Sequence, residues 1–434
     1  MSKEQTQQQQ QPRAGDGSSA QTPTPAASLP NINAETYPFE MVQHLLDQAA
    51  YFNLYSIPAA GEGAALRTGD GGSCTGFRIR EALHRFEVTM HEPTRATGLR
   101  AANAVGAQLG HFNHRWVICP DDFQARQGLE PPPTRLDPRS RQRFVMLDSV
   151  CHFGDGRDGF RGFGTGLTFP SVEGGQGRLL AAAVGNVVEG FGRFSGLEGT
   201  YTYCGSLTEQ EGFRGSLMLR LMDPQGVLGT DGGLPALESR QPPEPGITYL
   251  ILRGQKKDRR SKTTYSFGLD GQVNGLNVSQ QLRLVDIDAA VQGRAGLRSV
   301  KSVGPVIGKM NANIAFNLLN PGAPGTAQAP IPFQSFNEYT LYDRDGETVG
   351  SFVGDGGEGR TFNMQLAGAP GQRALRFGGF GPLMNGTGAF SGIGGLMSDN
   401  SVVGLAPHAI VTFYVLRVDD PEGKYRAGDG GAEQ

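Results

Sequence analysis

The chain has 434 residues, of which 65 are Gly and 19% are charged, and its formal net charge is −3. This Gly content, about twice the average, disfavours a mainly helical protein because Gly weakens helices. The near-balanced charge offers no strongly basic face for nucleic acid, and no apolar run approaches the ~20 residues of a membrane helix, so we expect no nucleic-acid partner and no membrane partner.

The N-terminal part is predicted to contain a disordered tail, a short helix and a linker. Residues 1–35 are rich in Gln, Pro, Ser and Thr, which is typical of disorder, and they lack the apolar segment of a secretory signal. Residues 36–75 follow as helix and linker, with a helix-like pattern in YPFEMVQHLLDQAAYFNLY, residues 37–55.

Cysteine usage indicates a reducing compartment. The four cysteines show no metal-ligand spacing and are few for a chain of this length. They are Cys74, Cys119, Cys151 and Cys204. We therefore expect reduced thiols in a cytoplasmic protein, and no metal site.

The rest of the chain contains an internal repeat. Residues 98–113 (GLRAANAVGAQLGHFN) match residues 296–311 (GLRSVKSVGPVIGKMN) at an offset of 198 residues. Three further pairs of segments keep the same order: 164–169 with 357–362, 188–199 with 384–395, and 219–224 with 416–421. Collinear matches at a nearly constant offset indicate a duplication.

The repeat divides the chain into two similar units. We expect unit 1 at residues 76–224, a linker with an extra hairpin at 225–273, unit 2 at 274–421 and a C-terminal tail at 422–434. Both units consist of short segments rich in Val, Phe, Tyr, Leu and Thr, bounded by Gly, Asp or Pro. This spacing predicts an antiparallel all-β sandwich or barrel in each unit, and not an α/β fold.

Several segments of unit 1 carry a family resemblance. In chain order they read MHE (90–92), VGAQLGHF (105–112), RFVMLDSVCHF (143–153) and AVGNVVEGFGRFSGLEGTYTYCG (183–205). This series resembles the dirigent and allene oxide cyclase superfamily, over residues 84–222 and again over 282–420. The resemblance implies two antiparallel eight-stranded barrels in tandem, each with an apolar pocket. It also implies cofactor-free cyclisation or coupling of a reactive substrate, usually by an oligomer.

The Gly-Phe-Ser pattern of residues 188–199 predicts a tight hairpin. We expect Gly190 and Gly192 to allow a positive φ or a bulge, and Phe194 to close the barrel and contact the substrate. A phosphate-binding loop is excluded, because the Gly spacing differs from the dinucleotide pattern and no helix signal follows.

The first candidate catalytic residues lie in the segment RFEVTMHE, residues 85–92. Strand alternation places Glu92 on the same face as three apolar residues, Phe86, Val88 and Met90, which we expect to bind substrate. A carboxyl group that continues an apolar face has its pKa raised by desolvation and can act as a general acid or base. The resemblance adds His91 to this site. The alternative is that Glu92 begins a solvated turn.

The second candidate group lies in RFVMLDSVCHF, residues 143–153. Alternation places Asp148 and His152 on the face of Phe144 and Met146. There a carboxylate and an imidazole could relay a proton, and we expect Met146 to contact the substrate. The alternative is an outward-facing pair at a domain contact.

Tyr201 and Tyr203 share a face beside the predicted hairpin. A Tyr hydroxyl can polarise an enone or epoxide oxygen, so we expect Tyr203 in a catalytic role and Tyr201 in substrate binding. Packing is the alternative for both. Five of the seven histidines lie in unit 1, which is therefore the better candidate for an active unit.

Two functions are open at this point. The first is a cofactor-independent cyclase or isomerase that folds a reactive polyene, epoxide or enone in a barrel pocket. The second is a non-catalytic pair of barrels that binds an apolar ligand or serves in an assembly. Both imply a small apolar ligand and no cofactor, and the outer barrel faces are the expected surface for homo-oligomers.

Overall fold

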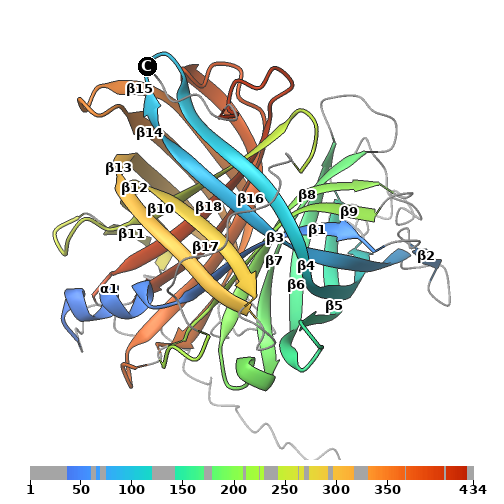
Figure 1. Ribbon diagram of the computed structural model, residues 1–434. Helices are drawn as coiled ribbons and strands as arrows, with labels where there is room; N and C mark the ends of the chain where they lie inside the picture. Colours follow the sequence, from blue (N-terminus) through green and yellow to red (C-terminus); the bar gives the residue numbers. More distant parts are fainter. Residues whose placement is uncertain are drawn as a thin grey trace, which may run out of the picture.

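The computed structural model describes residues 37–59, 65–68, 75–119, 142–170, 178–208, 212–223, 225–228, 243–261, 263–267, 273–291, 297–316, 331–366, 368–404 and 407–427. The predicted tail at residues 1–35 lies outside the described residues, as does the end of the chain after residue 427. The described part holds one α-helix and eighteen strands, which confirms the prediction of an all-β protein (Figure 1).

The elements of the first half follow in chain order. They are α1 (Phe39–Asp47), β1 (Ala50–Pro58), β2 (Ala65–Thr68), β3 (Thr75–Thr94), β4 (Gly98–Cys119), β5 (Gln142–Phe153), β6 (Asp158–Pro170), β7 (Leu179–Phe191), the 3₁₀ turn η1 (Gly192–Phe194), β8 (Gly199–Thr208) and β9 (Gly212–Leu221).

The second half repeats the strand order of the first. Its strands are β10 (Ile247–Gln255), β11 (Thr263–Phe267), β12 (Val273–Val291), β13 (Leu297–Phe316), β14 (Ile331–Tyr342), β15 (Thr348–Gln365), β16 (Arg373–Gly388), β17 (Gly395–Gly404) and β18 (Ile410–Asp419). β10 and β11 come from the segment predicted as a linker with an extra hairpin, residues 225–273.

The predicted helix at residues 37–55 is wrong in its second half. α1 ends at Asp47, and residues 50–58 form β1. β1 lies between β3 and β9 and pairs antiparallel with both. Its Tyr, Phe and Leu side chains are buried on both faces, a setting that favours a strand over a helix whatever the helical periodicity of the preceding segment.

The strand pairings form two circuits. Antiparallel pairing runs from β3 through each following strand to β9, and β1 joins β9 to β3; we call these eight strands the first circuit. The second circuit runs from β12 to β18, and β10 joins β18 to β12. β2 and β11 each pair with the strand that follows them.

The two circuits lie against each other (Figure 1). Val88 of β3 pairs with Ile287 of β12, the corresponding strand of the other circuit. The side chain of Asn103 donates to the Tyr249 carbonyl at 2.9 Å and accepts from the Tyr249 amide at 2.7 Å. The hydroxyl of Ser299 makes the same two contacts with the backbone of Tyr51. In each case a polar side chain of one half therefore binds the backbone of a Tyr in the other half.

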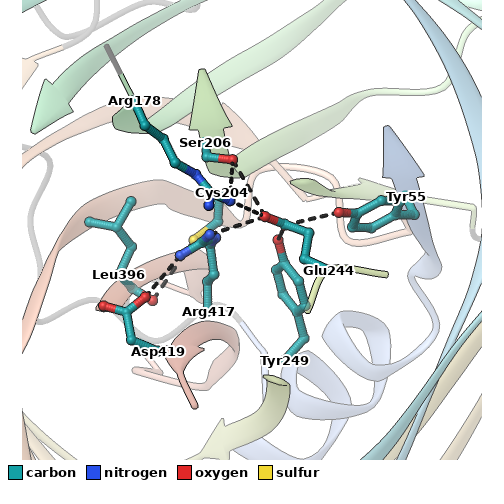
Figure 2. Close-up of polar contacts among 9 residues, drawn as sticks. All are labelled: Tyr55, Arg178, Cys204, Ser206, Glu244, Tyr249, Leu396, Arg417 and Asp419. Atoms are coloured by element: carbon teal, nitrogen blue, oxygen red, sulfur yellow. Dashed lines mark hydrogen bonds and ion pairs between the residues drawn. The ribbon is translucent and has the colours of Figure 1, made fainter. Parts of the chain in front are cut away.

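A buried carboxylate between the circuits binds residues of both halves (Figure 2). Glu244 is 2% exposed and accepts hydrogen bonds from the hydroxyls of Tyr55 and Tyr249, at 2.9 and 3.1 Å. Its other oxygen lies 2.6 Å from Arg178 and 3.1 Å from Arg417. The negative charge is therefore compensated by the buried Arg417 and the part-exposed Arg178, as burial of a carboxylate requires.

The repeated Gly-Phe-Ser pattern has the same geometry in both halves. Gly192 and Gly388 have φ angles of +62° and +59°, in the left-handed region that favours Gly. A Cβ atom on Gly190 would lie 1.9 Å from the Phe194 carbonyl oxygen, and one on Gly386 would lie 1.8 Å from the Phe390 carbonyl oxygen. The pattern thus encodes a tight turn in which the chain packs on its own backbone.

Substitution of Gly190 by Ala is expected to lower the free energy of unfolding by about 2–4 kcal/mol, because the backbone oxygen at 1.9 Å cannot rotate away. Gly196→Ala is the matched control: that position has a φ of +74° but open space around the Cβ, so only about 1–2 kcal/mol of backbone strain is expected. Chemical denaturation of both variants measures the difference. Equal losses would contradict a close-packing role.

Candidate functional site

The core of the first circuit contains a group of buried polar side chains from three strands. Glu81 of β3 and His114 of β4 have fully buried side chains. The Tyr203 hydroxyl of β8 donates a hydrogen bond to Glu81 Oε2. Glu81 Oε1 lies 3.8 Å from His114 Nε2, slightly beyond hydrogen-bond range. The three residues form the Glu81 centre.

Burial sets the protonation states of this centre. Desolvation raises the pKa of Glu81 from 4.5 to about 8, although the hydrogen bond from Tyr203 opposes the shift. Desolvation lowers the pKa of His114 from 6.5 to about 3. At neutral pH the pair is therefore a protonated carboxyl group facing a neutral imidazole, and the two groups do not form an ion pair.

Several polar atoms in the centre and beside it lack a hydrogen-bond partner among the described residues. They are Glu81 Oε1, both ring nitrogens of His114 and the indole nitrogen of Trp116. Buried polar atoms in native proteins are nearly always satisfied, by protein, water or ligand. Glu81 Oε1 and the ring nitrogens of His114 are therefore the atoms of the centre that remain open to a further hydrogen bond.

Aromatic side chains surround the centre. The ring of Phe112 lies 4.6 Å from that of His114 and 5.8 Å from that of Tyr203. Trp116 stacks on Phe144 at 4.0 Å. The environment is apolar and excludes water, which accounts for the desolvation of the carboxyl group.

The second circuit holds a different polar group at the corresponding positions. Gln280 corresponds to Glu81: the two pair with Met310 and Phe112, which are 198 residues apart. Asp399 corresponds to Tyr203, each being the fourth residue after the first Gly of its strand. Burial raises the pKa of Asp399 to about 6. These residues line a cavity of about 30 Å³, which has room for about one water molecule.

Four of the predicted residues of the first unit lie in the core around the Glu81 centre. Tyr203 belongs to the centre itself, and Tyr201 and Met146 are fully buried in the same cluster. Phe194 is in this cluster as well, where its ring stacks on Phe153 at 5.3 Å. The structure therefore brings together four residues predicted from separate segments.

Phe86, Val88 and Met90 lie elsewhere. They are buried in the cluster that fills the space between the two circuits. The ring of Phe86 lies 5.2 Å from that of Tyr55 and 5.4 Å from that of Tyr249. The register of β3 on β4 shifts between Leu83 and Phe86, so the apolar residues beyond the shift face β10 and β12. The three residues pack in this cluster and do not line a pocket together with the Glu81 centre, as a shared substrate site would require.

His91 and Glu92 lie at the far end of β3, at the surface. They line a pocket of about 940 Å³ together with residues of the β14–β15 turn. His91 is exposed, and Glu92 is bonded to Arg344, whose side chain is 82% exposed. Glu92 is thus in the solvated setting that was the alternative, at the end of β3 and beside the β14–β15 turn of the other half.

Asp148 and His152 are on the outer surface, and the predicted shared face is wrong beyond Met146. A bulge shifts the register of β5 on β6 between Met146 and Ser149. Asp148, with a φ of +52°, is part of this bulge, so the alternation inverts and Ser149 turns inward. The Asp148 carboxylate is 78% exposed and lies 3.3 Å from Arg115.

Sequence reasoning missed Glu81 and His114. A signal for Glu81 was present in FRIREALHRF, residues 77–86, where one acid stands between the apolar residues Ile79 and Leu83 at alternate positions. All three side chains are buried in the structure. The proximity of His114 depends on the β3–β4 register, which the sequence does not reveal.

No group of three or more His, Cys, Asp or Glu side chains in the described segments could hold a metal ion. Within the same segments, no helix is long and apolar enough to cross a membrane. Comparisons of the chain with protein-family models, curated proteins and solved structures gave no match. The superfamily resemblance therefore stays a prediction.

Proposed function

We propose that each circuit is an eight-stranded barrel of the dirigent and allene oxide cyclase type, and that the first barrel isomerises or cyclises a small apolar substrate by proton transfer. The observation that carries the proposal is the fully buried carboxyl group of Glu81, whose Oε1 has no partner among the described residues and lies 3.8 Å from His114 Nε2, which has none there either. Carboxyl groups with strongly raised pKa values and convergent polar neighbours are typical of acid–base sites.

One carboxyl group suffices for the chemistry. Glu81 donates its proton to the oxygen of an epoxide or enone, or to a double bond of a polyene. The resulting carboxylate then takes a proton from a neighbouring carbon, so that the substrate is rearranged and Glu81 regains its proton. The Tyr203 hydroxyl holds the carboxyl group in place, and the neutral His114 can accept or donate one hydrogen bond.

The proposal assigns the chemistry to the first circuit alone. In the second circuit the amide of Gln280 occupies the place of Glu81, and a cavity of about 30 Å³ is too small for a polyene. The second half then serves to cover the outer face of the first, through the cluster that includes Phe86 and Tyr249.

Incubation of the full-length protein with a panel of polyenes, epoxides and enones, followed by product analysis, tests this proposal. Conversion is expected, with a loss of at least about 100-fold in Glu81→Gln. Activity should fall above pH about 8, where Glu81 loses its proton. Glu92→Gln is the matched control, and a larger loss in that variant than in Glu81→Gln would place the chemistry at the surface pocket and contradict the proposal.

A non-catalytic barrel pair is the second candidate, and the close ring packing around Phe112 favours it. Native mass spectrometry of the freshly purified protein, with organic extraction, separates the two. A bound apolar compound that is recovered chemically unchanged after incubation supports a binding role. An altered compound supports the enzyme.

A further inference from the structure

Two corresponding groups of charged side chains lie at the contact between the circuits. In only one of them do the carboxylates match the cations in number. In β10–β18, Tyr249 pairs with Arg417, and in β1–β9, Tyr51 pairs with Arg220. Glu244 stands three residues before β10, and Asp47 stands three residues before β1. Each half therefore supplies a Tyr, an Arg and an acid, with the acid four residues before Tyr51 in one half and five residues before Tyr249 in the other.

The Glu244 side is balanced in charge, although Arg417 Nε has no hydrogen-bond partner among the described residues (Figure 2). Two guanidinium groups, from Arg178 and Arg417, bind the Glu244 carboxylate, and a second acid, Asp419, lies 3.1 Å from Arg417. Two cations thus face two carboxylates. The hydroxyls of Tyr55 and Tyr249 fill the remaining positions around Glu244.

The Tyr51 side has more basic than acidic side chains, and burial lowers the pKa of one of them, Lys301, to about 7. Arg253 takes the place that Tyr55 has on the other side, since both stand four residues after the paired Tyr. Lys301 lies 4.5 Å from the Tyr51 ring centre, and the Arg220 guanidinium lies 5.9 Å from it. A fourth basic side chain, Arg376, is fully buried; burial lowers its pKa, and repulsion from Arg220 adds to the shift.

Asp47 balances little of this charge. Its carboxylate bonds to Arg253 and is 37% exposed, whereas Glu244 is buried among its donors. Asp47 has one methylene group less than Glu244, and no hydrogen bond joins it to Arg220. The other acids with an electrostatic effect here are Asp399, which points into the core of the second circuit, and the exposed Glu198.

Donors at the centre of this group are left without acceptors. Arg220 is 0% exposed and uses one nitrogen for the carbonyls of Asn400 and Val411, at 3.0 and 3.2 Å. Its Nε and Nη2 atoms, Arg253 Nε and the Tyr51 hydroxyl have no partner in the part of the chain that the structure describes. Buried guanidinium donors without an acceptor and without a counter-charge are strongly unfavourable.

We propose that the group of Arg220, Arg253, Lys301 and Tyr51, at the C-terminal end of α1, is a binding site for a small oxyanion. A phosphate, sulfate or carboxylate group there would take the place that the Glu244 carboxylate has on the other side. Arg presents paired donors that suit such groups. The part-exposed Asp47 and Lys301 mark the side from which the anion enters.

Titration of the full-length protein with inorganic phosphate at constant ionic strength, followed by ³¹P NMR and thermal unfolding, tests the site. We expect saturable binding that is weakened at least about tenfold in Arg220→Gln, and retained in Arg161→Gln, an exposed control. A parallel titration with acetate shows whether a carboxylate suffices; acetate binding with the same Arg220 dependence supports the site equally.

Asp47→Glu is the second variant, and it adds the missing methylene group without removing a cation. It is expected to raise the melting temperature in chloride buffer and to abolish the phosphate effect, because the longer carboxylate fills the site from within. A phosphate effect of equal size in the wild type, Arg220→Gln and Asp47→Glu would be a general salt effect and would overturn the proposal. If Arg220→Gln does not fold, the result for Asp47→Glu decides.

Discussion

Replacement of Glu81 by Gln is expected to remove a large part of the pH dependence of stability. The native state holds the Glu81 proton up to pH about 8, whereas an unfolded chain releases it near 4.5. The native state is therefore favoured at low pH, and this advantage is lost as the pH rises from about 4.5 to about 8, at about 1.4 kcal/mol per pH unit. Gln cannot ionise, so the free energy of unfolding of the variant should rise relative to that of the wild type over this pH range.

The free energy of unfolding at pH 5, 6.5 and 8.5, from chemical denaturation, measures this effect as a difference between wild type and variant. The difference cancels the contributions of other titrating groups. One of them is His114: its pKa is lowered in the native state, so stability from this group falls as the pH drops below 6.5. Gln280→Glu is the matched control and should steepen the fall of stability with pH. Parallel curves for wild type and Glu81→Gln would show that Glu81 is ionised in the native protein.

Replacement of Glu244 by Gln is expected to lower the free energy of unfolding by about 3–5 kcal/mol. The variant keeps the shape of the side chain but leaves Arg178 and Arg417 without their shared carboxylate, and Arg417 is only 1% exposed. Removal of one partner from a buried ion pair costs more than the pair itself contributes, because the other charge remains buried.

Glu189→Gln is the control for charge removal. Glu189 pairs with Arg161 at 3.1 Å, but both side chains are more than half exposed, so a loss of no more than about 1 kcal/mol is expected. The double variant Glu244→Leu with Arg417→Met should recover part of the stability lost in Glu244→Gln. If the two single variants lost equal stability, the Glu244 contacts would not be a significant part of the link between the halves.

The proposed acid–base site and the surface pocket differ in their access to water. Glu81 is effective because water is excluded around it, whereas Glu92 is solvated and bonded to Arg344 at the surface. A substrate at the first site must displace or move aromatic side chains such as Phe112. Ligand binding is therefore expected to be slow relative to diffusion, a property that the incubation experiments would reveal.

The amino-acid sequence by itself determined the local features of this protein. The all-β class follows from short apolar segments between turn residues, and the tight turns follow from Gly at positions such as Gly192 and Gly388, where the φ angle is positive. The duplication was equally visible, since corresponding strands recur at a nearly constant offset. The class and the turns depend on residues close in sequence, and the duplication is a similarity between two stretches of the sequence itself, so all three can be read without the tertiary structure.

The tertiary structure alone decided which polar side chains meet. Strand alternation predicts a face only as far as the next bulge: the shift after Met146 turned Asp148 outward, and the shift after Leu83 turned Phe86 toward the other half. Glu81 and His114 come together through the register of β3 on β4. Because one inserted residue inverts every side chain that follows it, an active-site prediction from alternation fails where a strand is irregular.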